Sequence, residues 1–189
     1  PGHAPLAQTA AHARLRSGRP AQAAEHFRTA LELLPDTSSA SPEAVLRAGL
    51  GLAYVRLDRP QDARAAFEAA ESLAPNHPEV LRLHAHGLAD WGERLDQALE
   101  LAKRSVKQAP GQARPLHTLG WVQLQRKELA AARRHLRAAL KAGPPSPDLL
   151  KHLGDVEQAL GNDAAARTYR KRASQRSSPQ KNIQSAPNS

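Results

Sequence analysis

The sequence contains no cysteine and no methionine, and it is poor in aromatic residues. Two Trp, two Tyr and two Phe occur among 189 residues. Without cysteine the chain forms no disulfide, carries no thiol nucleophile and offers no thiolate to a metal ion. With so few aromatic side chains, a core must be built mainly from Ala and Leu. Such a core suits closely packed helices better than sandwiched sheets.

Long apolar runs are also missing from the sequence. A membrane-spanning helix needs about 18 or more consecutive apolar residues, so none is expected. No basic and then apolar leader with a small-residue cleavage site opens the chain. The first residue is Pro and there is no Met, which indicates a processed chain or an excised fragment.

The charge is distributed unevenly along the chain. The formal net charge is +9, but residues 1–102 carry 10 basic and 13 acidic residues, whereas residues 103–189 carry 17 and 5. The basic C-terminal half is a candidate binding face for an anionic polymer such as nucleic acid, polysaccharide or lipid headgroups. Its candidate residues are Arg133, Arg134, Arg137, Arg167, Arg170, Lys171 and Arg172. Nucleic-acid binders usually interleave aromatic residues with the cations, and only Tyr169 is available, so a solvated basic face is favoured.

An internal repeat of 34 to 35 residues runs through the sequence. The pair Leu-Gly occurs at 50–51, 119–120 and 153–154, which are separated by 69 and 34 residues. Prolines that end helical segments recur at Pro35, Pro75, Pro110 and Pro144. Between each Leu-Gly and its proline lie small residues at fixed offsets, such as Ala132 and Ala139 with Leu136 between them. A period of this length predicts a stack of similar structural units.

The clearest copy of the unit is LRAGLGLAYVRLDRPQDARAAFEAAESLAP, residues 46–75. Its Leu, Gly, Tyr, Ala, Phe, Ala and Pro resemble the pattern of the tetratricopeptide repeat, a helix–turn–helix unit of 34 residues. The resemblance implies an all-α, right-handed superhelical solenoid of about five repeats over residues 4–176. The expected repeats are 4–37, 44–77, 78–112, 113–146 and 147–176.

Three further expectations follow from the repeat. Gly51, Gly120 and Gly154 should lie where the first helix of a repeat touches the second, because a missing Cβ lets the two backbones approach. Residues 36–41 should form a loop insertion, since Pro35 and Pro75 are 40 residues apart. Residues 177–189 have almost no apolar content and should form a disordered tail.

In this family the first helix of each repeat lines a concave groove, and the resemblance carries twelve residues into that groove. They are Gln8, His12, Arg16, Leu52, Arg56, Arg82, His86, His117, Trp121, Gln125, Lys151 and Asp155. The groove grades from apolar to basic, so it should suit a peptide or protein segment with acidic and apolar residues. Trp121 is either an anchor for that segment or a packing residue, and its cationic and imidazole neighbours favour the anchor.

Other site chemistry finds less support in the sequence. One subset of the family grips a C-terminal carboxylate with Lys, Asn, Asn, Lys and Arg, and no set of corresponding positions here reproduces that clamp. His86, His117 and His152 lie on successive repeats whose helix axes are expected about 8–10 Å apart, so no metal site is expected. No phosphate loop, paired carboxylates or catalytic triad occurs, and no cofactor is expected.

The sequence therefore predicts a non-enzymatic scaffold that binds a peptide or protein segment in its concave groove. Two alternatives stay open, namely an anionic-polymer binder that uses the basic C-terminal face and a scaffold that self-associates through its terminal repeats. The segments around Gly120 and Gly154 also resemble repeats of bacterial scaffolding and assembly proteins. That resemblance implies the bacterial cytoplasm or the periplasm and envelope, and it favours the envelope.

Overall fold

The computed structural model describes residues 3–35 and 39–177, and these residues form ten α-helices and no strand. The helices are α1 (His3–Arg16), α2 (Pro20–Glu32), α3 (Ala40–Arg56), α4 (Pro60–Leu73), α5 (Pro78–Trp91), α6 (Leu95–Gln108), α7 (Ala113–Gln125), α8 (Leu129–Ala142), α9 (Pro147–Ala159) and α10 (Asp163–Ser177). They form five consecutive helical hairpins, so the all-α helical-repeat solenoid expected from the 34-residue period is confirmed.

The ends of two expected segments differ from the structure. Helix α3 begins at Ala40, so residues 40 and 41 of the expected loop are helical. Residues 36–38 of that loop lie outside the described residues. Ser177 is the last residue of α10, and the rest of the expected tail also lies outside the described part of the chain.

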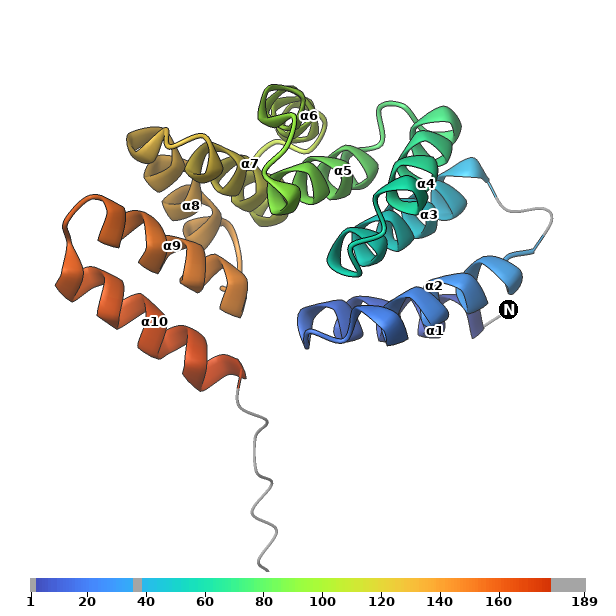
Figure 1. The fold of residues 1–189 in the computed structure, drawn as a ribbon, viewed down its shortest axis with the longest axis horizontal. Helices are drawn as coiled ribbons and strands as arrows, with labels where there is room; N and C mark the ends of the chain where they lie inside the picture. The colour runs from blue at the N-terminus through green and yellow to red at the C-terminus, as the bar shows by residue number, and fades with distance from the viewer. Residues whose placement is uncertain (1–2, 36–38, 178–189) are drawn as a thin grey trace, which may run out of the picture.

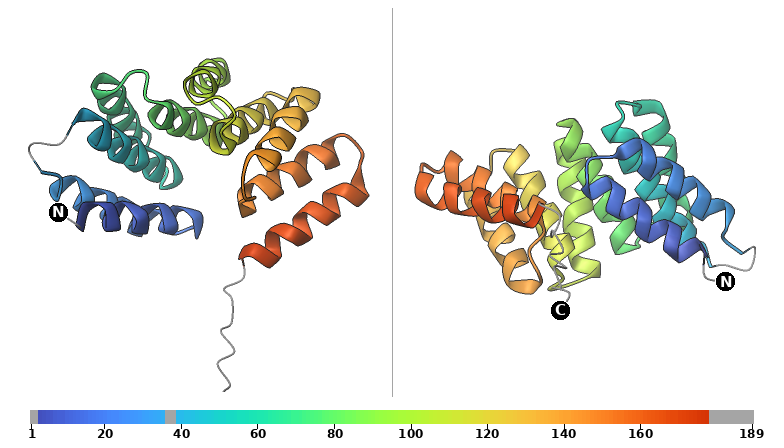
Figure 2. Two further views of the ribbon diagram at one scale, coloured as in Figure 1. Left: turned by 180° about the vertical axis from the view of Figure 1, so that it is seen from behind. Right: turned by 90° about the horizontal axis from the view of Figure 1, so that it is seen from below.

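The hairpins follow an arc whose two ends turn toward the same side (Figure 1 and Figure 2). Along the arc, α3 packs on α5 and α5 packs on α7, while each second helix packs on the first helix of the next hairpin. The odd-numbered helices thereby line the inner side of the arc. This inner side is where a solenoid presents its extended concave surface.

Close contact within the second, fourth and fifth hairpins depends on the repeated glycines. A Cβ built on Gly120 would lie 2.7 Å from Cγ and 3.0 Å from the backbone nitrogen of Leu136, and one built on Gly51 would lie 2.9 Å from the Phe67 ring. A Cβ on Gly154 would lie 3.0 Å from Cγ of Arg170. The three Leu-Gly glycines therefore lie where the two helices of a hairpin touch, as the period predicted.

The turn between α5 and α6 differs in backbone conformation from the turns inside the other hairpins. Gly92 has a φ of 71° and Arg94 a φ of 48°, so the chain adopts two left-handed residues within three positions. Trp91 precedes this turn and packs against both the N-terminal and the central core clusters. It lines a cavity of about 120 Å³ on the outer side, between α4, α5 and α6. Trp91 thus fills space where two repeats meet.

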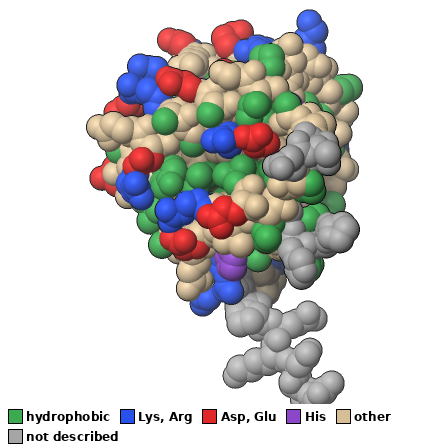
Figure 3. Space-filling view, turned by 90° about the vertical axis from the view of Figure 1, so that its right-hand side faces the viewer, with side chains coloured by type: hydrophobic (Ala, Val, Ile, Leu, Met, Phe, Trp, Pro, Cys, Tyr) green, Lys and Arg blue, Asp and Glu red, His purple; other side chains and the backbone are tan. Residues whose placement is uncertain are grey.

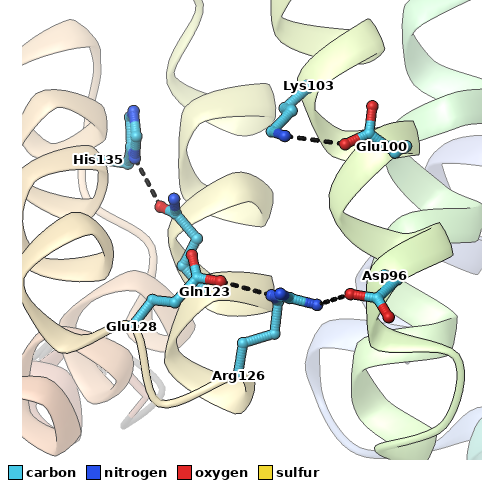
Figure 4. A network of polar contacts seen from close by, with 7 residues as sticks. All are labelled: Asp96, Glu100, Lys103, Gln123, Arg126, Glu128 and His135. Carbon is cyan, nitrogen blue, oxygen red and sulfur yellow. Dashed lines mark hydrogen bonds and ion pairs between the residues drawn. The ribbon is translucent and has the colours of Figure 1, made fainter.

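Polar side chains hold the fourth hairpin to α6 and join its own two helices (Figure 4). Arg126, directly after α7, binds Asp96 of α6 and donates from Nε to Glu128 at 2.6 Å. On the other flank, His135 Nδ1 of α8 and Oε1 of Gln123 are 2.6 Å apart. These bonds tie α6, α7 and α8 together and help to fix the curvature of the arc.

Exposed apolar side chains occur toward both ends of the arc. At the N-terminal end, hydrophobic side chains lie among charges of both signs (Figure 3). Leu6 on α1 is 67% exposed there, and Leu160 after α9 is 37% exposed near the other end. If the scaffold self-associates through its terminal repeats, these two leucines are the exposed apolar side chains nearest to the chain ends.

Within residues 3–35 and 39–177, no helix is both long enough and apolar enough to span a bilayer.

Candidate functional site

The inner side of the arc contains a hollow of about 410 Å³, here called the inner hollow. Residues of α1, α3, α5 and α7, of the segment between α8 and α9 and of the first turn of α9 surround it. They are His12, Leu15, Arg16, Leu52, Arg56, Arg82, Leu83, His86, Ala113, Arg114, His117, Pro144, Ser146 and Asp148. Four arginines thus face one aspartate over buried leucines, so the lining is cationic with an apolar floor.

A second hollow of about 460 Å³ adjoins the first at His12 and Arg114. It is lined by Gln8, Thr9, His12, Val45, His77, Pro78, Glu79, Gln112, Arg114 and Pro115. The two hollows together make a continuous concave surface from α1 to the start of α9. A surface of this length suits an extended chain segment better than a compact small molecule.

Two of the arginines are held by a single carboxylate. Arg82 donates from Nε and Nη2 to the two oxygens of Glu79 at 2.7 and 2.8 Å, and Arg114 Nη2 lies 2.9 Å from Glu79 Oε1. Burial alone would raise the pKa of Glu79, but Arg82 and Arg114 beside it lower that pKa to about 2. Glu79 is therefore ionised at neutral pH and fixes both guanidinium groups along the hollows.

Arg56 joins three first helices. Its Nη1 donates to the backbone oxygen of Leu15 on α1 at 2.8 Å, and its Nε lies 3.5 Å from Asp90 Oδ2 on α5.

Arg16, the last residue of α1, has no ion pair among the residues that the structure describes. Arg16 therefore presents a guanidinium group that no carboxylate of the described residues neutralises.

Four histidines in or beside the inner hollow, His12, His86, His117 and His152, are held in the neutral form. Burial, followed by the nearby arginines, lowers the pKa of His12 to about 4. Burial and then His86 lower the pKa of His117 to about 3. Burial lowers the pKa of His86 as well, and burial followed by His117 lowers that of His152. At neutral pH the positive charge of the inner hollow therefore comes from its arginines.

The imidazoles of neighbouring repeats approach more closely than the helix spacing suggested. His117 Nε2 and His152 Nδ1 are 3.0 Å apart, and the rings of His86 and His117 are 6.5 Å apart between centroids. These side chains reach across the gap between their helices, so the helix spacing alone does not keep the rings apart. Among the described residues, no group of three or more His, Asp or Glu side chains is arranged to hold a metal ion.

Trp121 connects the third, fourth and fifth repeats. Its indole stacks on the His152 ring with 3.9 Å between centroids and 8° between planes. Its Nε1 donates to Asp90 Oδ1 at 3.1 Å. One ring face and the only polar side-chain atom of Trp121 are thus occupied within the protein. A role as binding anchor would rest on the remaining ring face.

We expect Trp121→Ala to lower the free energy of unfolding by about 2–3 kcal/mol, because it removes a half-buried indole and its stack on His152. Trp121→Phe keeps an aromatic ring but loses the hydrogen bond to Asp90, so this substitution should lower the free energy of unfolding by about 1 kcal/mol. Urea titrations of the two variants and the wild type provide the measurement. Equal stability of Trp121→Ala and the wild type would contradict this role.

The groove positions expected from the repeat register fall into two groups. Seven of the twelve line the inner hollow: His12, Arg16, Leu52, Arg56, Arg82, His86 and His117. Gln8 lines the adjoining hollow. Trp121, Gln125, Lys151 and Asp155 line neither hollow. Asp155 instead forms an ion pair of 3.0 Å with Arg170 of α10.

Several lining residues were missed by the sequence reasoning, above all Glu79, Arg114 and Asp148. Each lies in the first turn of its helix, α5, α7 or α9. The repeat register assigned groove positions only to the middle and end of the first helices. The start signals HPE and SPD (77–79 and 146–148) mark two of these helix ends, but they gave no indication that the ends border a groove.

The basic C-terminal residues are partly neutralised within the protein. Arg133 and Arg137 bind the fully buried Glu157 at 3.1 and 2.8 Å, and Arg170 binds Asp155. The other four expected anion-binding residues have no ion pair in the described ranges; they are Arg134, Arg167, Lys171 and Arg172. The available basic charge at this end is therefore smaller than the sequence indicated.

Comparisons with known proteins agree with this architecture. The sequence profile of the family described as tetratricopeptide repeat matches residues 1–87 and 93–150. The human protein "Tetratricopeptide repeat protein 7B" is 26% identical over 113 residues, which are 60% of this chain and 13% of the human protein. This chain therefore spans only a small part of that relative's length.

Two solved structures show the same fold. A thermophilic tetratricopeptide repeat protein of Thermus thermophilus aligns with a TM-score of 0.72 and 17% identity over 92% of this chain and 91% of its own. The pilF protein of Pseudomonas aeruginosa aligns with a TM-score of 0.62 and 22% identity over 94% and 78% of the two chains. The repeat period, the five hairpins and the profile match lead to one conclusion: this chain belongs to the tetratricopeptide repeat family.

Proposed function

We propose that this protein is a non-enzymatic scaffold that binds an extended segment of a partner protein along its concave surface. Tetratricopeptide repeat proteins are in general non-catalytic modules that bind protein partners. The observation that carries the proposal for this chain is the inner hollow, which joins buried leucines to four arginines. A segment with acidic and apolar side chains complements such a lining in both shape and charge.

The rigidity of the arc supports the same function. Arg56 links α1, α3 and α5, Arg126 links the third repeat to the fourth, and Trp121 links the third and fourth repeats to the fifth. Because these bonds exist within the protein alone, the walls of the hollow are already in place before a partner arrives. A preformed surface of this kind loses little conformational entropy on binding.

A peptide-display selection with a matched pair of variants tests the proposal. Ala113 lines the inner hollow at the start of α7, whereas Ala130 is exposed on the outer side of α8. We expect random peptides to be enriched on the wild type and on Ala130→Tyr, and to lose enrichment on Ala113→Tyr, whose ring fills the hollow. Thermal melting followed by circular dichroism confirms that both variants are folded.

The selection also separates the competing binding face. Equal enrichment on Ala113→Tyr and on the wild type would contradict binding in the hollow. If enrichment then fell in a variant with Arg134→Gln and Arg167→Gln, the basic C-terminal face would be the binding surface. Steep loss of binding with salt would accompany that result, because polymer binding releases counterions.

A further inference from the structure

Three guanidinium groups from three helices converge on the concave surface around one carboxylate. Arg16 comes from α1, Arg82 from α5 and Arg114 from α7, and only Glu79 binds members of this set in the described part of the chain. The set therefore carries two positive charges in excess at neutral pH, with His12 beside it uncharged. A protein surface that keeps such an excess has room for a further anion.

Arg16 and Arg114 belong to opposite walls of the inner hollow. Arg16 is the last residue of α1 and Arg114 the second residue of α7, and these two helices do not pack against each other. Both side chains nevertheless line the same hollow and both are exposed to solvent. Burial first, and then repulsion from Arg82 and Arg16, lowers the pKa of Arg114, which shows that these cations act on one another. An anion between them would relieve that repulsion.

We infer that Arg16 and Arg114 form a two-walled anion site that holds an acidic side chain of the bound segment. This inference rests on the proposed function, and it names the chemistry that the partner must carry. Guanidinium groups bind carboxylate and phosphate oxygens through paired, charge-assisted hydrogen bonds, so both groups fit the site. The anion connects α1 to α7, which no bond within the described chain does directly.

The residues around Arg16 and Arg114 indicate which side chain should lie next to the acidic one in the bound segment. Leu15, Leu52 and Leu83 are buried on the floor of the same hollow and offer apolar contact to a neighbouring side chain. His86 also lines the hollow, and its buried Nδ1 has no hydrogen-bond partner among the described residues. Because this nitrogen is closed to solvent, His86 adds no polar contact to the segment in this conformation. The expected motif is an acidic residue next to an apolar one.

The test repeats the random-peptide selection on Arg16→Gln, on Arg114→Gln and on the double variant. We expect acidic residues to be enriched on the wild type and that enrichment to disappear on the double variant. Each single substitution should weaken a selected peptide by about tenfold to a hundredfold in fluorescence anisotropy, the usual effect of a charge-assisted bond. The double variant should be little weaker than either single one, because one anion needs both walls.

Control variants and matched peptides make the outcome specific. Arg134→Gln with Arg167→Gln removes the same charge outside the hollow and should leave the affinity unchanged. Replacing the peptide's glutamate with glutamine should abolish the difference between the wild type and the double variant. Replacing it with phosphoserine should preserve that difference and shows which of the two anions binds more tightly.

The failures of the two proposals can be told apart. If wild-type protein selects peptides without acidic enrichment, or if the arginine variants bind them with unchanged affinity, the anion site is wrong and groove binding stands. If the control variant loses as much affinity as the double variant, the effect is one of net charge and the anion site is again wrong. If wild-type protein enriches no peptide at all, the proposed function fails and the anion site fails with it.

Discussion

Replacing Gly120 with leucine is expected to lower the free energy of unfolding by at least about 3 kcal/mol, near or above the upper end of overpacking effects in protein cores. Even a Cβ at this position would lie 2.7 Å from Leu136 Cγ and 3.0 Å from the Leu136 backbone nitrogen. The contact with backbone means that α7 and α8 must move apart, because a backbone atom cannot rotate out of the way. Urea denaturation of the variant and the wild type measures the effect.

A matched pair of smaller substitutions separates packing from helix propensity. Gly120→Ala and Gly154→Ala both gain about 1 kcal/mol of helix propensity. The added Cβ at Gly154 meets Cγ of Arg170 at 3.0 Å, part of a flexible side chain, and the Ala166 oxygen at 3.3 Å. We therefore expect Gly154→Ala to be near neutral and Gly120→Ala to be destabilising. Equal effects of the two substitutions would show that close helix contact is not why glycine recurs in this pair.

Mild acid is expected to destabilise the protein through the histidines of the concave surface. An unfolded histidine has a pKa of about 6.5, whereas the folded pKa is about 4 for His12 and about 3 for His117. Below about pH 6.5 the unfolded chain therefore binds protons that the folded chain does not, and stability falls as the pH falls. The loss continues until the pH reaches each folded pKa.

The size of this effect follows from the shift. Each such histidine lowers the free energy of unfolding by about 1.4 kcal/mol for every pH unit below its unfolded pKa. His12 and His117 together therefore lower it by about 4 kcal/mol between pH 7 and pH 5. His86 and His152 shift in the same direction and add to the loss. Glu79 contributes its own loss only below about pH 4.5, since its pKa is lowered to about 2. Urea titrations at pH 7, 6 and 5 measure the slope.

The double variant His12→Asn with His117→Asn is the control for the acid effect. It should be less stable than the wild type at pH 7, because it loses the bond between His117 and His152. Its stability should nevertheless change less between pH 7 and pH 5. A slope identical to that of the wild type would mean that other groups cause the acid sensitivity.

The sequence predicted the helical hairpins well because their packing is local. Gly120 and Leu136 belong to one hairpin, and Gly51 and Gly154 make the corresponding contact in the second and fifth hairpins, so the period of small residues indicates it directly. The start of α3 at Ala40 was less predictable, because Ser39 and Ser41 both offer plausible N-caps. The left-handed conformation of Arg94 was not predictable either, because residues other than glycine rarely adopt a positive φ.

The sequence predicted only those features of the site that depend on the position of a residue within its own repeat. Register placed His12, Arg56 and His117 on the inner side, and all three line the inner hollow. Whether Arg16 of the first repeat faces Arg114 of the fourth depends on the curvature of the whole arc. That curvature arises from contacts between repeats, which have no sequence period. Similarly, the binding of Arg133 and Arg137 by Glu157 depends on how α8 packs on α9.

The central claim is that a partner segment binds along the concave surface. Hydrogen–deuterium exchange of the protein with and without a selected acidic peptide tests this claim most directly. We expect slower exchange in α1, α3 and α5 and in the first turns of α7, whose residues line the two hollows. Protection confined to α8 and α10, with α1 and α5 unchanged, would contradict the claim and place the partner on the basic C-terminal face.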